Sequence, residues 1–190
     1  MRRNAFTRLK IVGIEDGSFT EEMSETLLVA VLMQNGRWIE DIKIKEITID
    51  GLDATATALQ LLKDWNFDAI MLAGVSYAGF NLIDPIKLAE SFQKPVIIMS
   101  RSKPNNIAVK RALKEHFKDW KARWQVFEGL GPIYKFKPLR NEPSIYLEVV
   151  GAEASWAMTV IKSCCFSCRV PEPIRVARII ARGLSPSLAS

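Results

Sequence analysis

Acidic side chains stand directly after two apolar segments in the first third of the chain. Glu15 and Asp16 follow the run LKIVGI, and Asp50 and Asp53 end or follow the alternating run RWIEDIKIKEITID. Carboxylates grouped at strand ends can hold Mg²⁺ or Mn²⁺, because hard cations prefer oxygen ligands. All four acids are therefore candidate catalytic residues, and Glu15 and Asp16 are the candidate metal ligands. A second interpretation stays open, in which Asp53 caps the next helix and Asp50 completes a turn with Gly51.

Positive charge is concentrated between residues 101 and 123. This segment holds eight Lys and Arg against two acids, whereas residues 15 to 53 hold ten acids against three bases. A solvated helix face is one interpretation of the basic segment. The other is a surface that binds nucleic-acid phosphates beside an acidic cation site, as a nuclease would need.

The last predicted helix carries a stripe of arginines. Arg175, Arg178 and Arg182 follow i, i+3, i+7 spacing, which suits either phosphate contacts or a solvated face. The candidate contacts to DNA or RNA are Lys103, Lys110, Arg111, Lys114, Arg175 and Arg178.

A pocket for a base is predicted in the segment SYAGFNLI. Tyr77, Phe80 and Asn81 follow a buried strand there, and aromatic side chains stack on any base. Glu172 is a further candidate for this pocket. Its alternative role is to stabilise the first turn of its helix, where the helix dipole favours a carboxylate.

Other chemistries lack the residues that they need. His116 is the only histidine and lies in an amphipathic helical pattern, which leaves a serine hydrolase without a base. Cys164, Cys165 and Cys168 cluster in SCCFSC, and we interpret them as reduced structural thiols, with metal or redox chemistry as the alternative. No glycine-rich loop of the nucleotide-binding folds is present.

The elements that must position these residues begin with three strands. Asn35-Gly36 separates two β-rich runs and is typical of a tight hairpin turn, because both residues tolerate positive φ. With LKIVGI, this predicts three antiparallel strands. Residues 54–65 then show helical spacing, and DAIMLAGV and KPVIIMS are apolar strands separated by a helix that begins at Asp84-Pro85.

The second half is predicted less evenly. NNIAVKRALKEHF indicates a helix that uses Ile107, Val109, Leu113 and Phe117, while residues 119–143 are interpreted as an inserted hairpin. A strand in SIYLEVV and helices in GAEASWAMTVIKSC and PEPIRVARIIARGL follow. Strands that alternate with helices imply parallel pairing, hence an α/β fold.

The chain of 190 residues suits a single domain at 1–190, with residues 185–190 as a frayed tail. Its apolar share of 48% and charged share of 25% are those of a globular protein. Neither a membrane-spanning segment nor a secretory signal is recognisable, so we expect a cytoplasmic protein.

Four motifs in order carry a family resemblance over nearly the whole chain: GIEDGSF, TIDGLDAT, GVSYAGFNLID and RVPEPIRVA. They resemble an archaeal family, domain of unknown function 99, which in turn is similar to endonuclease V. The resemblance implies a ribonuclease H-like mixed sheet, with three antiparallel strands and then parallel strands, flanked by helices.

The same resemblance implies a depleted catalytic set. The strand-end aspartate of endonuclease V falls on Glu15, while Thr57 and Ala73 stand where its second and third acids would be. A histidine of that enzyme corresponds roughly to Ala152. One remaining carboxylate cannot hold a two-metal site alone. We therefore expect an endonuclease V-like protein that binds nucleic acid with weak or lost cleavage. The alternatives are an active Mg²⁺-dependent endonuclease with an altered carboxylate site, and a protein-interaction module.

Overall fold

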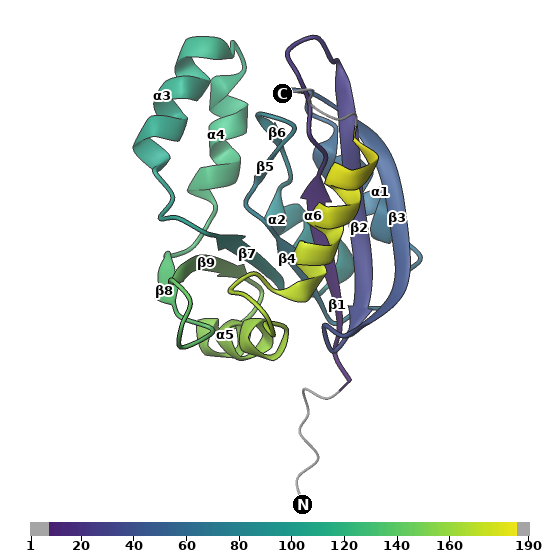
Figure 1. The fold of residues 1–190 in the computed structure, drawn as a ribbon. Coiled ribbons are helices and arrows are strands. Elements are labelled where there is room, and N and C mark those ends of the chain that lie inside the picture. Colours follow the sequence, from purple (N-terminus) through teal and green to yellow (C-terminus); the bar gives the residue numbers. More distant parts are fainter. Residues whose placement is uncertain (1–7, 186–190) are drawn as a thin grey trace, which may run out of the picture.

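A mixed seven-stranded sheet organises the protein, in a computed structural model that describes residues 8–185 (Figure 1). The strand order is β3-β2-β1-β4-β7-β9-β8. The strands are β1 (Lys10–Asp16), β2 (Glu25–Gln34), β3 (Trp38–Thr48), β4 (Ala69–Leu72), β7 (Val96–Ser100), β8 (Tyr134–Phe136) and β9 (Ile145–Val150). The first three strands are antiparallel, and β1, β4 and β7 are parallel, as predicted.

The last two strands depart from the parallel pattern. β9 runs antiparallel to both β7 and β8, because β8 and β9 form a hairpin at the edge of the sheet. A small separate hairpin, β5 (Ser76–Tyr77) and β6 (Asn81–Leu82), follows β4. The carboxyl ends of β1, β4 and β7 therefore meet at one edge of the sheet, and the carboxyl end of β9 lies at the opposite edge.

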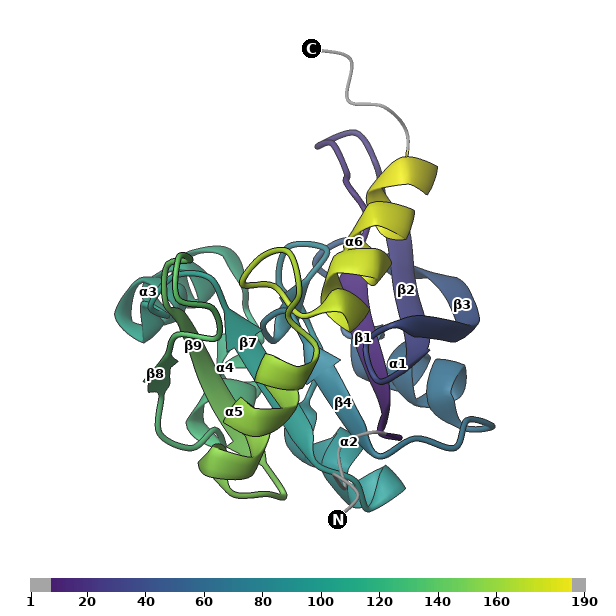
Figure 2. The same ribbon diagram turned by 60° about the horizontal axis from the view of Figure 1, so that its bottom comes forward.

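Helices cover both faces of the sheet (Figures 1 and 2). The helices α1 (Ala54–Leu62) and α2 (Pro85–Phe92) pack on one face, where Ile14, Leu61 and Leu88 share an apolar core. The opposite face is covered by α5 (Ala154–Ser163) and α6 (Glu172–Leu184). The helices α3 (Asn106–His116) and α4 (Trp120–Glu128) pack on each other and form a helical hairpin after β7.

Two local predictions are confirmed by the backbone. Asn35 and Gly36 have φ of 57° and 62°, the left-handed conformation that a type I′ turn requires. Asp84 caps α2, and its Oδ1 accepts hydrogen bonds from the backbone N–H of Ile86 and Lys87.

Residues 119–143 differ most from the prediction. Instead of a hairpin alone, the segment contains the helix α4 and then β8, which pairs with β9. Ile107 is 86% exposed and does not belong to the core face of α3, whereas Leu113 is fully buried. The prediction for residues 119–143 was wrong because Trp120 and Trp124 lie against lysine side chains of the α3–α4 hairpin instead of pointing into a core.

The carboxyl-terminal tail is predicted for 185–190, of which 186–190 lie outside the described residues. Ser185 is buried, and its hydroxyl donates to Ala181 O and accepts from Ser18 N–H. Among residues 8–185, no helix is both long and apolar enough to cross a membrane.

Candidate functional site

The acidic corner lies at the carboxyl end of β1. Glu15 and Asp16 follow Ile14, which pairs with Leu72 at the end of β4. Glu15 is only 6% exposed and points toward α6, whereas Asp16 Oδ2 accepts a 2.6 Å hydrogen bond from the backbone N–H of Ala78. The alternation of side chains along β1 thus sends the two carboxylates to opposite faces of the sheet edge.

An arginine faces Glu15 from α6. Arg178 Nη2 forms an ion pair with Glu15 Oε1, and both side chains are largely buried. A cavity of about 360 Å³ opens beside this pair, lined by Glu15, Asp16, Gly17, Ser18, Phe19, Arg178 and Arg182. Two acids and two guanidinium groups therefore share one cleft at the carboxyl edge of the sheet.

Burial dominates the electrostatics of this cleft. It raises the pKa of Glu15 to about 7, although the positive charge of Arg178 acts in the opposite direction. Burial also raises the pKa of Asp16, against the lowering effect of the Ala78 N–H. Tyr77 lies beneath the corner, fully buried, and its hydroxyl accepts from Ala73 N–H and donates to Ile14 O.

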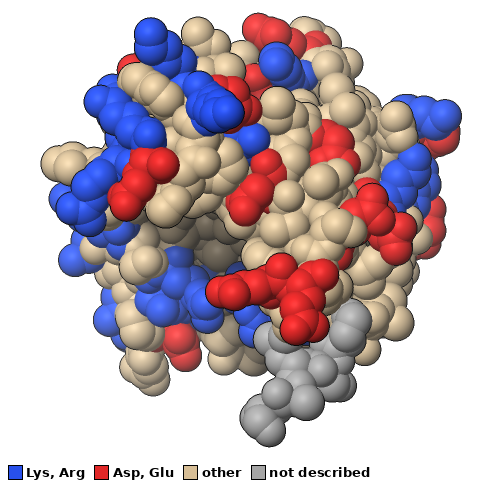
Figure 3. Space-filling view, turned by 90° about the horizontal axis from the view of Figure 1, so that it is seen from above, with Lys and Arg blue, Asp and Glu red and all other residues tan. Residues whose placement is uncertain are grey.

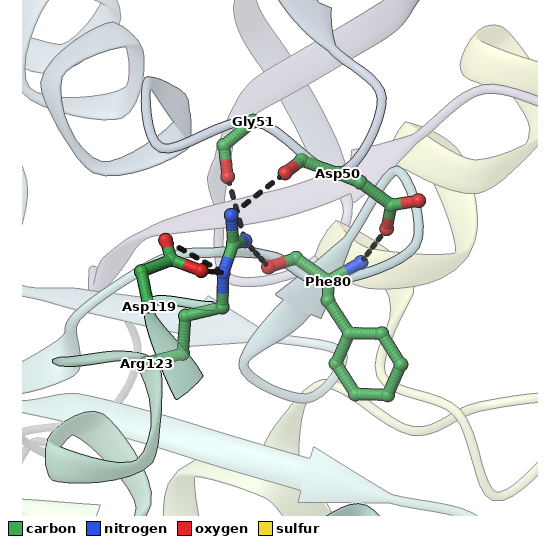
Figure 4. A network of polar contacts seen from close by, with 5 residues as sticks. All are labelled: Asp50, Gly51, Phe80, Asp119 and Arg123. Atoms are coloured by element: carbon green, nitrogen blue, oxygen red, sulfur yellow. Dashed lines mark hydrogen bonds and ion pairs between the residues drawn. The ribbon is translucent and has the colours of Figure 1, made fainter. Parts of the chain in front are cut away.

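Asp50 lies across a tight turn from Asp16. Its φ of 56° places it in the left-handed region, its N–H donates to Ala78 O, and its Oδ1 accepts from Phe80 N–H at 2.7 Å (Figure 4). Asp16, at the end of β1, and Asp50, in the turn after β3, thus both bond to the turn Ala78–Phe80. The structure therefore places the two carboxylates on the two sides of one short turn.

Asp53 occupies the N-cap position of α1, as one interpretation predicted, but its side chain does not cap the helix. Its carboxylate accepts hydrogen bonds from Thr48 N–H and Oγ1 and from Asn81 Nδ2, and it makes no side-chain bond to the first turn of α1. Asn81 is fully buried and its Oδ1 accepts from Ala54 N–H. Asp53 and Asn81 therefore fix the corner between β3 and α1.

The donor set does not fit a divalent metal site. Within residues 8–185, no group of three or more His, Cys, Asp or Glu side chains converges as metal ligands. Glu15 is already neutralised by Arg178, and Asp16, Asp50 and Asp53 each accept hydrogen bonds from the protein. A two-metal centre needs several oxygen ligands free to face the cations, so the residues present do not hold one in this arrangement.

The base pocket predicted from SYAGFNLI is not formed by its three residues together. Tyr77 and Asn81 are fully buried supports of the sheet edge, so their side chains cannot stack on a ligand. Phe80 is partly exposed and packs edge-on against Phe117, with ring centroids 5.4 Å apart. Glu172 is also buried and belongs to α6, where its carboxylate pairs with Arg175.

The predicted phosphate contacts divide into engaged and unengaged side chains. Arg175 Nε lies 2.9 Å from both carboxylate oxygens of Glu172, so its charge is already paired. Lys110 and Lys114 lie over the rings of Trp124 and Trp120, at 4.6 and 4.8 Å from the centroids.

Lys103 and Arg111 are exposed and have no ion pair with a described residue. Figure 3 faces the carboxyl edge of the sheet and shows Lys and Arg side chains gathered on the side of α3 and α4. A hollow separates them from acidic side chains nearer the centre.

Two residues that the sequence placed poorly are located by the fold. Ala152 follows β9, at the edge of the sheet opposite the acidic corner, so it cannot take the place of a histidine in this cleft. The residue that faces Glu15 is Arg178, which the sequence offered only as a phosphate contact. The i, i+3 spacing of Arg175 and Arg178 predicted that they share a face of the helix, but it could not predict that Arg178 pairs with Glu15.

Two of the three clustered cysteines have the features of buried structural thiols. Cys164 and Cys165 are buried, and burial raises the pKa of their thiols to about 11 and about 12. A thiol with so high a pKa is a poor nucleophile and a poor metal ligand at neutral pH. Cys164 packs near Gly36 in the β2–β3 turn.

The raised pKa of Glu15 gives a testable pH dependence of stability. Below a pH of about 4.5, Glu15 is protonated in both the folded and the unfolded chain. Between that pH and about 7, the unfolded chain releases the proton while the folded chain keeps it, so stability must fall as the pH rises. This loss amounts to about 3 kcal/mol at most. Urea unfolding of wild type and Glu15→Gln at pH 5 and pH 8 measures it, and equal losses in the two proteins would contradict the prediction.

Comparisons with known proteins agree with the fold. The model of the family described as endonuclease dU matches residues 7–185. A UPF0215 protein of Methanothermobacter thermautotrophicus is 34% identical over 188 residues, covering 96% of this chain and 91% of the relative. A UPF0215 protein of Methanopyrus kandleri is 33% identical and covers 99% of this chain and 97% of the relative.

Two solved structures extend the likeness. A crystal structure of an Archaeoglobus fulgidus protein superposes with a TM-score of 0.81 at 26% identity, covering 92% of this chain and 96% of that one. Endonuclease V of Ciona intestinalis, in complex with a 23mer DNA containing an inosine, superposes with a TM-score of 0.61 at 13% identity. This superposition covers 90% of this chain and 82% of that one. The second likeness shows a shared fold, the ribonuclease H-like fold predicted from the motifs. The chain therefore belongs to the endonuclease dU family, together with the archaeal UPF0215 proteins.

Proposed function

We propose that the protein binds nucleic acid on an endonuclease V-like scaffold and that its cleavage activity is weak or lost. The observation that carries this proposal is the ion pair between Glu15 and Arg178 in the cleft at the carboxyl edge of the sheet. A carboxylate paired in this way is no longer free to bind a cation. Arg182, which lines the same cleft and has no ion pair with a described residue, instead offers positive charge to a phosphate.

The charge distribution supports a nucleic-acid partner. The α3–α4 hairpin begins at the same edge of the sheet as the cleft. Lys103, in the loop before α3, and Arg111, on α3, have no ion pairs with described residues. Lysine and arginine side chains that neutralise phosphates release counterions and give salt-dependent affinity. The fold is shared with a protein solved in complex with DNA.

The binding prediction compares two double variants that remove the same charge. Lys103→Ala/Arg111→Ala removes the free charges near the hairpin, and Lys63→Ala/Lys94→Ala removes two lysines near the opposite edge. For labelled DNA and RNA, the first variant should lose roughly tenfold in affinity at low salt, and its plot of log affinity against log salt should become less steep by about two. The second variant should match the wild type in a fluorescence anisotropy titration. Equal effects of both variants would contradict a binding surface on the hairpin.

A second candidate function is a metal-dependent nuclease with an altered site. Its specific support is that Asp16, at the end of β1, and Asp50, in the turn after β3, both bond to the turn Ala78–Phe80. Incubation of deaminated and structured DNA and RNA with Mg²⁺ or Mn²⁺ distinguishes the two functions. Cutting that is lost in Glu15→Gln/Asp16→Asn would overturn the binding-only proposal. Retention of the labelled strand without cutting would favour it.

If the chain neither binds nor cuts nucleic acid, a protein-interaction module becomes the leading candidate function. Trp38 is 68% exposed and Ile39 is 49% exposed, both on the edge strand β3. Exposed apolar side chains on an unpaired strand edge are typical of protein contacts.

A further inference from the structure

A second cavity lies where the α3–α4 hairpin meets the sheet. Its volume is about 220 Å³, and it reaches from the carboxyl ends of β4 and β7 to the beginning of α3. Val109 of α3, Phe127 of α4 and Leu130 give it apolar walls on the side of the hairpin. Ile98 of β7 and Glu148 of β9 line it on the side of the sheet.

Glu148 is the unusual member of this lining. It is only 7% exposed, and it lies opposite Ile98 in the pairing of β7 with β9. It makes no hydrogen bond or ion pair with any residue from 8 to 185. Burial raises the pKa of this carboxyl, and no other residue that lines the cavity is titratable.

The carboxyl of Glu148 opens into the cavity, so a ligand that displaces water from it must donate an N–H or O–H in its place, or the buried carboxyl is left without a donor at a cost in free energy. The group that repays the cost must fit between apolar walls and present an N–H or O–H toward Glu148. A flat heterocycle with a ring N–H meets both conditions, because its faces contact Val109 and Phe127 while its edge donates.

The neighbourhood of the cavity favours a heterocycle joined to a phosphate chain. Asn105 and Asn106 at the beginning of α3 also line the cavity, and Lys103 lies two residues before Asn105. A nucleotide whose base entered the cavity would leave its phosphates near Lys103, which lies beside Asn105 and Asn106 in a neighbouring cavity and has no ion pair with a described residue.

We propose that this cavity is a nucleobase pocket and that Glu148 is the residue that selects a base by accepting a hydrogen bond from its N–H. The inference rests on the proposed nucleic-acid binding and adds a specificity-determining residue to it. Glu148 can accept this hydrogen bond in either protonation state, because a protonated carboxyl keeps one accepting oxygen and adds one donor.

The test uses a short single-stranded DNA with one variable central position. That position carries uracil, N3-methyluracil or an abasic site: methylation replaces the ring N–H with a methyl group, and the abasic site removes the whole base. Wild type should bind the uracil strand about tenfold more tightly than the other two, as one hydrogen bond to a buried acceptor allows. Glu148→Leu should lose this ratio and keep the affinity for the abasic strand.

Controls separate the inference from the function on which it rests. Glu115→Leu removes an exposed carboxylate on α3 and should keep the wild-type ratio. Val109→Phe narrows the cavity with an apolar side chain and should lose the ratio even if Glu148→Leu folds poorly. The base pocket would be overturned if wild type bound all three strands with equal affinity. It would also be overturned if Glu148→Leu and Val109→Phe both kept the wild-type affinity ratio, and either result would leave the proposed nucleic-acid binding intact. No binding of any strand at low salt would overturn the proposed function as well.

Discussion

Replacing Gly13 by alanine is expected to lower the free energy of unfolding by about 4 kcal/mol or more. A Cβ atom at residue 13 would lie 2.2 Å from both the carbonyl carbon and the carbonyl oxygen of Pro173, and 2.7 Å from Ile174 N. All three atoms belong to the backbone, so no side-chain rotation relieves the overlap. The first turn of α6 must then move away from β1, and with it Arg178 must move from Glu15.

The measurement is urea unfolding of wild type and Gly13→Ala, with Gly183→Ala as the matched control. Gly183 lies in α6 with no atom within 4 Å of its added Cβ, so alanine there should stabilise the helix by about 0.5–1 kcal/mol. A loss of less than about 1 kcal/mol for Gly13→Ala would contradict the close packing of β1 on α6. Because the cleft depends on that packing, affinity for labelled DNA should fall together with stability.

Gly13 and Pro173 belong to two of the motifs on which the family resemblance was based. The sequence predicted both segments correctly, as a strand end and a helix start, because local spacing and the Pro-Glu-Pro signal determine them. It could not predict that they touch. That contact joins the two ends of the chain, and a single sequence carries no signal of such pairings.

The same limit explains the site. Glu15, Asp16 and Asp50 were predicted as strand-end acids, and the structure does place them at one edge of the sheet. The alternation of side chains along β1, however, turns Glu15 toward α6, where it forms an ion pair with Arg178. Asp53 and Asn81 were selected for their chemistry, yet they hydrogen-bond each other at the β3–α1 corner. A polar residue near a site is often part of the support that positions it.

Arg123 shows how a structural role can be hidden in a charge pattern. The sequence counted it among the bases of the segment 101–123, but it is only 6% exposed. Its guanidinium donates to the backbone carbonyls of Asp50, Gly51 and Phe80 at 2.6 to 2.9 Å, and it pairs with Asp119 at 3.1 Å (Figure 4). One side chain of α4 thus fastens the helical hairpin to the corner that carries Asp50.

Arg123→Met should therefore cost about 3–5 kcal/mol of stability, because three carbonyl groups lose their buried donor and Asp119 loses its partner. Arg123→Lys should recover only part of the loss, since an ammonium group cannot reproduce the planar arrangement of donors that reaches all three carbonyls. Arg111→Met makes the same substitution at an exposed position of α3 and should change stability by less than about 0.5 kcal/mol.

Hydrogen exchange distinguishes loss of the anchor from general unfolding. In Arg123→Met, amides of α3 and α4 should exchange faster than those of β1 and β4, because the hairpin is fastened to the sheet partly through this residue. Uniform acceleration across the chain, or none in the hairpin, would contradict the anchoring role. If the hairpin loosens, the cavity under Val109 and Phe127 loses a wall, so base selection should fail in Arg123→Met even though Glu148 is intact.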